Sequence, residues 1–270
     1  MGIALISRND DFGSSHAANR AILEAARCGY ITRNVSCMAP APYIAEAAEE
    51  LKKYKHIAIG MHATLNSEWD GIRWGALTAN AHKHGFARED GSFYASQQEL
   101  AAAGPDIDAI LKEYDAQLDL LTKLGLPISY VDSHMFPEYF IPELYEAFGK
   151  WIAAKGLIDA EDYYYLSDPL SPETKEDATD YMAGLEKWLA ELTHGQQYFY
   201  LAHPACDSEE SLLMYNKNIP KGAMRLERSM EHLAVTSPRW EAWMKNFDIT
   251  PVRYTEAKKV ERGAFERRIL

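Results

Sequence analysis

Six acidic or imidazole side chains stand directly after short apolar runs, where buried strands would end. Two of them, Asp10 and Asp11, close the first such run and precede a turn at Gly13. Neighbouring carboxylates near a buried strand end raise each other's pKa unless a cation or hydrogen-bond donors compensate. A bound metal would provide that compensation, with Asp11 as its ligand and Asp10 free as a base towards a bound water. By itself the pair would fit equally well a solvated loop in which an aspartate caps the next helix.

The other four residues make the metal interpretation the stronger one. His62, His134 and His203 each end an apolar strand pattern, and Asp132 stands two residues before His134. In a parallel barrel the carboxyl ends of all strands meet at one rim, so residues far apart in sequence would converge there. One carboxylate and two imidazoles, with positions left for water, suit a catalytic divalent cation. The remaining histidines fall in helix or loop patterns, and we interpret them as solvated structural residues, with contact to substrate considered only for two of them, His82 and His84.

The overall composition limits the number of domains and the kinds of partner that we expect. A chain of 270 residues that is 47% hydrophobic can bury a large core. No linker separates two halves, so we expect a single domain over residues 1–270. The 28 basic and 40 acidic residues give a formal net charge of −12, which disfavours nucleic acid and anionic membranes as partners. A neutral or small-molecule substrate fits better.

Cysteine usage and hydropathy indicate the compartment. The three cysteines, Cys28, Cys37 and Cys206, form no CxxC pair and are odd in number, which disfavours a disulfide framework or a thiolate metal site. The first residues lack a signal-peptide pattern, and no apolar run reaches the roughly 18 residues that span a membrane. We therefore expect a cytoplasmic protein with no membrane segment.

Strand and helix patterns alternate along the chain. After the opening strand, strands are predicted at 32–38, 55–61, 127–131, 163–166, 197–202 and 249–254, and helices at 15–27, 42–53, 105–124, 142–155, 171–193, 224–233 and from 237. About seven strands alternating with helices predict an α/β fold, a distorted (β/α) barrel. The chain has neither a GxGxxG nor a P-loop motif to support an open doubly wound sheet. The irregular segment 64–104 is interpreted as a lid or substrate wall, or else as a peripheral or oligomer contact.

Four short motifs and several single residues stand in an order that matches a known family. The motifs are Asn9-Asp10-Asp11-Phe12-Gly13, Gly60-Met61-His62, Val131-Asp132-Ser133-His134 and His203-Pro204. Further agreement comes from Asn19, Asp90-Gly91-Ser92-Phe93, Gln117, Arg228 and Glu231. Together they resemble the YdjC-like family of carbohydrate deacetylases, and the match spans nearly the whole chain.

The resemblance implies a distorted (β/α) barrel that removes N-acetyl groups from sugars or oligosaccharides with one divalent metal. By position, Asp11, His62 and His134 correspond to the metal ligands. Asp10 corresponds to the catalytic base and His203 to the second catalytic group, the acid.

The residues around this set receive supporting roles. Asp132 is expected to orient a ligand histidine, and Arg228 to support the site, with an Arg228–Asp132 ion pair as the structural alternative. A wall on which sugar rings stack is expected from the aromatic side chains Trp69, Trp74 and Tyr139, although such residues serve as often in packing.

The chain departs from the family pattern after two motifs. Met135 and Phe136 follow His134 where many members have further histidines, and Ala205 replaces the glycine of His-Pro-Gly. We expect these changes to affect which sugar is accepted rather than the reaction.

Other functions remain open from the sequence alone. They are another metal-assisted hydrolase acting on an amide, an ester or a phosphorylated sugar, and a sugar-binding protein without turnover. A glycosidase is disfavoured, since adjacent acids on one strand cannot flank a bond at about 5–9 Å. The metal is expected to be Mg²⁺ or Zn²⁺, with Mn²⁺, Co²⁺ and Ni²⁺ also compatible, and a homodimer is expected for an enzyme of this size.

Overall fold

A single parallel sheet forms the centre of the molecule. The computed structural model describes residues 2–163 and 178–260, and all seven strands in this part of the chain belong to that sheet. The strand order is β5-β4-β3-β2-β1-β6, and β7 pairs with β1 as well. The strands are β1 (Ile3–Phe12), β2 (Asn34–Cys37), β3 (Ala58–Ala63), β4 (Ile128–Ser133), β5 (Ile158–Asp159), β6 (Gln197–Ala202) and β7 (Ile249–Val252).

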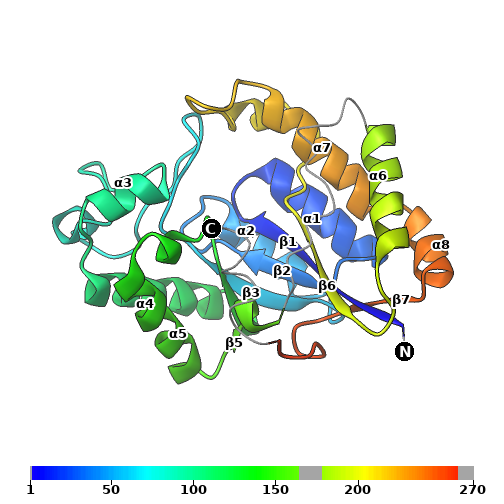
Figure 1. The fold of residues 1–270 in the computed structure, drawn as a ribbon. Coiled ribbons are helices and arrows are strands. Elements are labelled where there is room, and N and C mark those ends of the chain that lie inside the picture. Colours follow the sequence, from blue (N-terminus) through cyan, green and yellow to red (C-terminus); the bar gives the residue numbers. More distant parts are fainter. Residues whose placement is uncertain (1, 164–177, 261–270) are drawn as a thin grey trace.

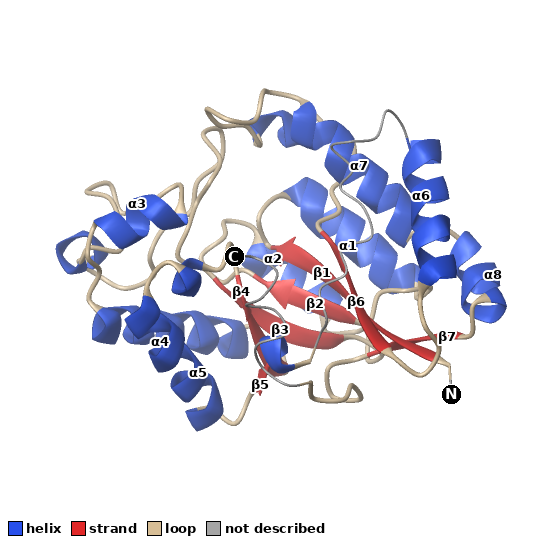
Figure 2. Ribbon diagram, in the orientation of Figure 1, coloured by secondary structure: helices blue, strands red, loops and turns tan. Residues whose placement is uncertain are grey.

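Helices cover the outer side of this curved sheet (Figures 1 and 2). One group packs beside β2, β3 and β4, and the other packs beside β1, β6 and β7. The first contains α2 (Ile44–Leu51), α3 (Gln97–Ala102), α4 (Ile107–Lys123) and α5 (Pro142–Ala154), and the second contains α6 (Ala178–Glu191), α7 (Ala223–Val235) and α8 (Arg239–Asn246). Helix α1 (His16–Cys28) contributes to both groups. None of the described helices is long and apolar enough to cross a membrane.

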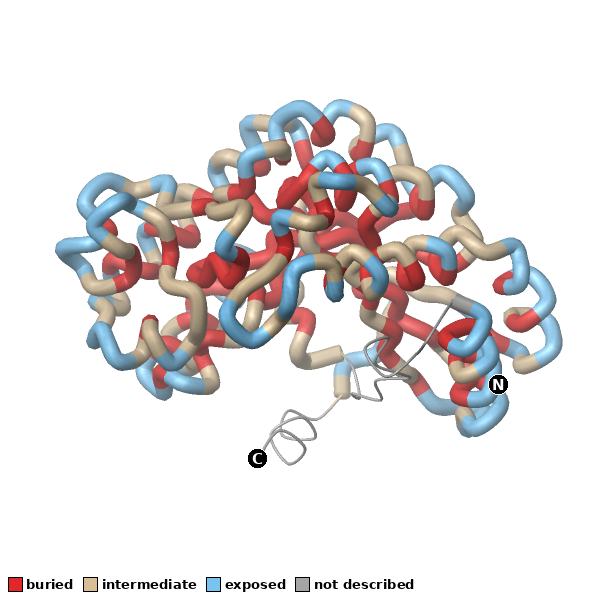
Figure 3. Tube along the Cα trace, turned by 90° about the horizontal axis from the view of Figure 1, so that it is seen from above, coloured by how far each residue is buried: buried red, intermediate tan, exposed pale blue. Residues whose placement is uncertain are grey.

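Strand β1 holds the sheet together because it has three neighbours. Its first half pairs with β7 and β6, and its second half pairs with β6 and β2. It is ten residues long and buried almost throughout, as expected for a parallel strand covered on both faces. Its first four residues are apolar, and the five from Ser7 to Asp11 are polar or charged. Figure 3 shows buried residues concentrated in the middle of the molecule, with exposed residues around them.

The inner face of the sheet is filled by side chains from several strands. Ile6, Tyr130, Phe199 and Tyr254 form a buried cluster that draws no residue from α1 to α8 within the described ranges. They come from β1, β4, β6 and the segment after β7, so the concave side is a packed core, as in other (β/α) barrels. Its polar edge lies towards the carboxyl ends of the strands.

The barrel is distorted because β5 and β6 do not pair. The C-terminal segment 253–260 bridges this side instead. The Gln197 amide donates to the Lys258 carbonyl at 2.8 Å and accepts from its N–H at 2.8 Å, and the Val260 N–H donates to the Asp162 carbonyl at 2.7 Å. A chain segment thus takes the place that an eighth strand would have.

The alternation predicted from the sequence is confirmed, with shifts at the element ends. His62 is the fifth residue of β3 rather than the residue after it. Most of the predicted strand 163–166 lies outside the described residues, and its one described residue, Tyr163, is not in a strand. The short β5 at Ile158–Asp159 pairs with β4. The predicted helix 171–193 is described only from Ala178, and α3 within the irregular segment was not predicted.

Two long loops meet above the carboxyl ends of the strands. One follows β3 and the other follows β6, and they lie side by side at the top of Figure 1. The Asp70 N–H donates to the Tyr215 carbonyl at 2.7 Å, and the Gly71 N–H to the Leu213 carbonyl at 3.2 Å. A Cβ at Gly71 would stand 2.5 Å from that Leu213 oxygen, so only glycine allows this approach.

The inner core predicts a strong effect of adding one methyl group at Gly60. A Cβ there would lie 2.2 Å from the Tyr130 ring, which Tyr254 and Ser36 hold from the other sides. We expect Gly60→Ala to lower the free energy of unfolding by about 1–3 kcal/mol through overpacking, measured by denaturant unfolding. An unchanged midpoint would mean that the Tyr130 ring is free to move.

Candidate metal centre and catalytic site

A bulge in β1 turns Asp10 and Asp11 towards the same site. Neighbouring residues of a regular strand point to opposite faces. Here the pairing with β2 advances from Asn9 to Phe12 on one strand but only from Val35 to Cys37 on the other, so β1 contains one extra residue. Asp11 has a φ of 66°, a left-handed conformation that aspartate tolerates better than most residues.

The parallel register brings His62 and Asp132 together. They are direct partners on β3 and β4, and His62 Nδ1 lies 2.6 Å from Asp132 Oδ2. His134 continues the same ladder past the end of β4, since its N–H donates to the Ala63 carbonyl at 3.0 Å. The register therefore brings both imidazoles to one end of the sheet, where they approach the Asp11 carboxylate.

Asp11, His62 and His134 form a compact triangle of donor atoms. Asp11 Oδ1 lies 3.6 Å from His62 Nε2 and 3.5 Å from His134 Nδ1, and the two nitrogens are 3.2 Å apart. Donors that hold one ion at about 2.0–2.2 Å with tetrahedral angles stand about 3.3–3.6 Å apart. Asp11 Oδ1 is buried and has no hydrogen-bond partner. The three predicted ligands thus fit a divalent cation in distance and in chemistry.

Both imidazoles have a carboxylate on the nitrogen that faces away from the triangle. Asp132 contacts Nδ1 of His62, and Glu68 Oε2 lies 3.0 Å from Nε2 of His134. If each far nitrogen donates to its carboxylate, the other nitrogen keeps a lone pair towards the triangle, as in metal-binding histidines. The sequence predicted this role for Asp132. It missed Glu68, which lies in the irregular loop with no pattern to mark it.

Arg8 is a second residue that the sequence analysis missed. Its guanidinium contacts both oxygens of Asp10, at 2.7 Å and 2.8 Å, and lies 3.3 Å from Asp132. It also donates to the Tyr254 hydroxyl at 3.1 Å. Arg8 is 1% exposed. Its position two residues before Asp10, on the same face of β1, is the signal that could have identified it.

His203 and Arg228 stand on the β6 side of the site. His203 follows Ala202, which pairs with Asn9, so it reaches the level of Asp10. The His203 N–H donates to Glu231 Oε2 at 2.9 Å, and its carbonyl accepts from Arg228 at 3.3 Å. Arg228 lies 3.8 Å from Asp11 Oδ2. The alternative Arg228–Asp132 ion pair is wrong, since Arg8 contacts Asp132 instead.

Carboxylates outnumber permanent cations in this cluster. Burial opposes ionisation of Asp11, but His62, His134 and Arg228 more than offset it and hold the Asp11 pKa well below its ordinary value. Burial also disfavours the charged imidazole of His62, yet the charges of Asp132 and Asp10 raise its pKa to about 10. The site therefore attracts positive charge, and a proton on His62 or a metal ion can supply it.

The three aromatic residues expected to bind sugar are well packed. Trp69 and Trp74 are 5% and 4% exposed. Trp74 donates to the Asn66 carbonyl at 2.7 Å, and its ring meets the His134 ring edge-on with centroids 6.0 Å apart. Tyr139 lies beside Phe136 and Tyr145. Their contact with a sugar stays a prediction.

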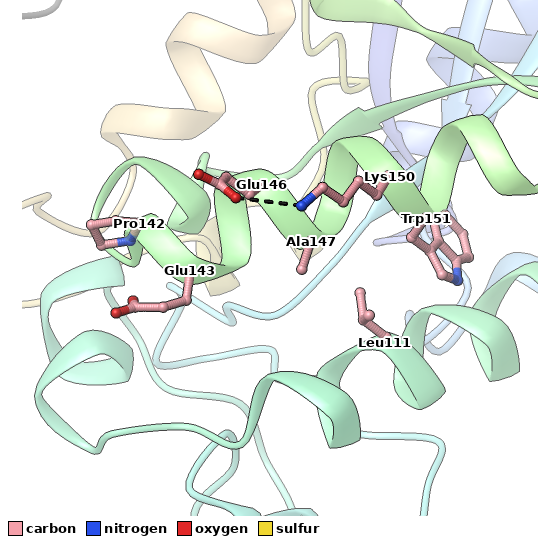
Figure 4. Close-up of a pocket in the computed structure, with 7 residues that line it drawn as sticks. All are labelled: Leu111, Pro142, Glu143, Glu146, Ala147, Lys150 and Trp151. Carbon is pink, nitrogen blue, oxygen red and sulfur yellow. Dashed lines mark hydrogen bonds and ion pairs between the residues drawn. The ribbon is translucent and has the colours of Figure 1, made fainter.

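A large surface groove lies away from this cluster of residues. A cavity of about 670 Å³ between α4 and α5 is lined by residues including Leu111, Lys150 and Trp151 (Figure 4). It contains none of the six residues singled out by the sequence, and α4 and α5 pack on the outer side of the sheet. The cluster of ionisable side chains, rather than the size of a groove, therefore locates the candidate site.

Comparison with known proteins agrees with the fold and with the family that the motifs indicated. The sequence profile described as YdjC-like protein matches residues 4–246, about nine-tenths of the chain. The chain therefore belongs to the YdjC-like family, as its motifs indicated.

Curated relatives match over part of their length. A chitooligosaccharide deacetylase of Proteus mirabilis is 30% identical over 145 residues, covering 52% of this chain and 53% of the relative. A carbohydrate deacetylase of Enterococcus faecalis is 29% identical over 137 residues, covering 48% and 47%. The matched part of the chain thus spans about half the length of these relatives.

Solved structures share the fold. A crystal structure from Enterococcus faecalis, named provisionally as a cellobiose-phosphate cleavage protein, has a TM-score of 0.67 at 18% identity over 94% of this chain and 98% of that one. The catalytic domain of a peptidoglycan N-acetylglucosamine deacetylase from Eubacterium rectale has a TM-score of 0.50 at 12% identity over 97% and 94%. The predicted distorted (β/α) barrel is a deacetylase-like fold.

Removing the buried guanidinium should destabilise the protein strongly. Arg8→Met would leave Asp10 and Asp132 buried without their cation, and we expect the free energy of unfolding to fall by about 3–5 kcal/mol. Denaturant unfolding at neutral pH measures this change in the free energy of unfolding. Arg20→Met is the control, because Arg20 is 74% exposed and its loss should change stability by less than about 0.5 kcal/mol. Similar losses in both variants would contradict this role.

Glu138 should make stability depend on pH. Its carboxyl is buried beside the site, where it accepts from Ser133 at 2.7 Å, and burial followed by the charge of Glu161 raises its pKa from 4.5 to about 8. A raised pKa favours folding below pH 4.5, and this stability is lost as pH rises towards 8, because only the unfolded chain ionises. The denaturant midpoint of Glu138→Gln should therefore rise relative to that of wild type as the pH increases from 5 to 8.5. Glu146→Gln is the control at an exposed position, so its denaturation midpoint should differ from that of wild type by the same amount at every pH. A constant difference for Glu138→Gln would contradict this account.

Proposed function

We propose that the protein is a metal-dependent carbohydrate deacetylase that hydrolyses the N-acetyl group of a sugar or oligosaccharide. The observation that carries the proposal is the donor triangle of Asp11, His62 and His134 with the separate carboxylate of Asp10 beside it, in a member of the YdjC-like family. The names of the curated relatives support the reaction class. Binding alone would require no base next to a cation site.

Asp11, His62 and His134 would hold the metal. A divalent cation at this position supplies Lewis acidity to the amide carbonyl and lowers the pKa of a coordinated water. Asp132 and Glu68 fix the ring orientation of the two histidines through their far nitrogens, which raises their basicity as ligands. Two imidazoles and one carboxylate suit Zn²⁺, and they admit Mg²⁺ when water completes the coordination.

Asp10 acts as the general base in this proposal. Its Oδ2 lies 3.9 Å from His62 Nε2, close to the triangle but outside it. Both of its oxygens are held by Arg8, which fixes the direction of the carboxylate and disfavours a shift towards the ion. Burial raises the Asp10 pKa, although Arg8 opposes the rise, and a more basic carboxylate accepts a proton from water more readily.

His203 acts as the general acid towards the leaving amine. An imidazole titrates near neutrality and can give its proton at the pH where the base is ionised. The backbone contacts to Arg228 and Glu231 fix its position at the end of β6. We propose that Arg228, with Asp11 on one side, steadies the negative charge that develops at the carbonyl oxygen. Trp69, Trp74 and Tyr139 remain the proposed wall beside the sugar.

Metal analysis with acetate release tests the function. We expect about one equivalent of Zn²⁺ or Mg²⁺ per chain and acetate from at least one member of a panel of N-acetylated mono- and oligosaccharides. Bound metal without acetate from any of them, but with turnover of esters or sugar phosphates, would favour a different metal-assisted hydrolase. Bound sugar without any turnover would favour a binding protein.

Two substitutions separate the base from the ligands. Asp10→Asn should keep one equivalent of metal and lose about 10²–10⁴-fold in kcat, because the proton acceptor is removed. His134→Ala should lose metal affinity, because one corner of the triangle is gone. Metal content and kcat measured side by side check both. Equal loss of metal in the two variants would contradict the division of roles.

A further inference from the structure

A second group of metal-ligating side chains shares no residue with the metal centre. Glu24 of α1, Cys206 of the loop after β6 and His232 of α7 each offer one donor atom within 4.8 Å of the other two, and we call them the interhelical cluster. His232 Nε2 lies 2.9 Å from Glu24 Oε2. Ligand atoms on one zinc ion stand about 3.3–3.6 Å apart, so these two atoms would separate by only a few tenths of an ångström around an ion.

Backbone contacts hold the three elements of the cluster together. Helix α7 packs against α1 (Figure 1). The Cys206 N–H donates to the Ala17 carbonyl in the first turn of α1 at 3.0 Å, and the neighbouring Ala205 N–H donates to the Arg228 carbonyl in α7 at 3.1 Å. The loop thus carries the thiol to the line where the two helices meet. Donor atoms that are already gathered in this way pay a smaller entropy cost when they enclose an ion.

The protonation states in the cluster suit a divalent cation. Burial opposes ionisation of Glu24, but hydrogen bonds from Arg20 and His232 more than offset it and lower the Glu24 pKa. Burial and then the charge of Glu24 raise the pKa of the Cys206 thiol, and Arg20 opposes the rise. A zinc ion would release the thiol proton to solvent. Its two positive charges would then be balanced by one thiolate and one carboxylate.

The thiol distinguishes this cluster from an ordinary ion pair. A surface contact between Glu24 and His232 needs no third group, whereas Cys206 adds a ligand that Zn²⁺ and Co²⁺ accept and Mg²⁺ does not. The side chains of Glu24 and His232 are 27% and 16% exposed, so an ion can enter and a water molecule can complete four ligands. The positive charge of Arg20, which lies 3.1 Å from Glu24, opposes a cation here.

We propose that Glu24, Cys206 and His232 form a second cation site, which binds Zn²⁺ and similar ions in preference to Mg²⁺. It is weaker than the metal centre, because Arg20 stands beside it and the metal centre has the larger excess of buried negative charge. The site therefore fills after the first equivalent of Zn²⁺. A bound ion would join α1 and α7 to the segment that follows His203. The inference does not depend on the deacetylase reaction.

Titration of the metal-free protein with Co²⁺ tests the site by spectroscopy. A thiolate bound to Co²⁺ gives a charge-transfer band in the near ultraviolet, which aspartate and histidine ligands do not give. We expect this band in wild type between one and two equivalents of Co²⁺, and also in His134→Ala whatever happens at the metal centre. Cys206→Ser should lose the band, and the control Cys28→Ser, at an exposed thiol, should keep it. No band in wild type, or a band that survives Cys206→Ser, would overturn the site.

A labelling measurement on the wild-type protein gives an independent test. Iodoacetamide alkylates free thiols, and mass spectrometry follows each cysteine separately. With two equivalents of Zn²⁺ we expect alkylation of Cys206 to slow at least tenfold and that of Cys28 to stay the same, and Mg²⁺ should protect neither. His232→Ala should raise the Zn²⁺ concentration for half protection at least tenfold. An unchanged Cys206 rate, equal protection of both cysteines, protection by Mg²⁺ or full protection in His232→Ala would overturn the proposal.

Discussion

The structure depends on placing an excess of buried negative charge around two fixed guanidinium groups. Carboxylates from β1, β4, the loop after β3 and α7 converge at this site, where Arg8 and Arg228 are the only permanent cations among the residues that the structure describes. Buried carboxylates that stay ionised require paired charges or a metal ion. The donor triangle is the place where the missing charge fits. The same excess of buried negative charge that lowers the stability of the folded chain would favour the binding of a divalent cation.

Backbone geometry creates this arrangement more than any single side chain does. The extra residue in β1 allows two consecutive aspartates to serve one site in two roles, and the register of β3 and β4 places a carboxylate behind one histidine. Arg8 holds the Asp10 carboxylate in place, and the segment after β7 supports Arg8 through the Tyr254 hydroxyl. The C-terminal segment therefore contributes to the site although it lies on the side where the barrel does not close.

The sequence was sufficient to predict which acidic and imidazole residues lie near the ends of strands. Asp10, Asp11, His62 and His134 follow apolar runs of a parallel fold, so topology alone brings them to one rim. Glu68 was missed because it lies in a loop where neither period nor spacing constrains its direction. Arg8 was missed because only the residues at the strand ends were considered, although the spacing of two residues from Asp10 places Arg8 on the same face of β1.

Elements that were missed in the sequence have a similar cause. Strand β5, which needs only two residues to pair with β4, was not predicted, and most of the strand that was predicted at 163–166 lies outside the described residues. Helix α3 is too short for hydrophobic periodicity to reveal it. Such elements are set by their tertiary contacts, which a single sequence does not display.

The ligand set of the metal can be measured directly. Anomalous diffraction from crystals grown with one equivalent of Zn²⁺ or Co²⁺ would locate the ion and its ligands in one experiment. The account predicts a single strong peak bound by Asp11, His62 Nε2 and His134 Nδ1, with Asp10 still paired to Arg8. A peak that excludes either histidine, or one bound by Asp10 after its separation from Arg8, would contradict it.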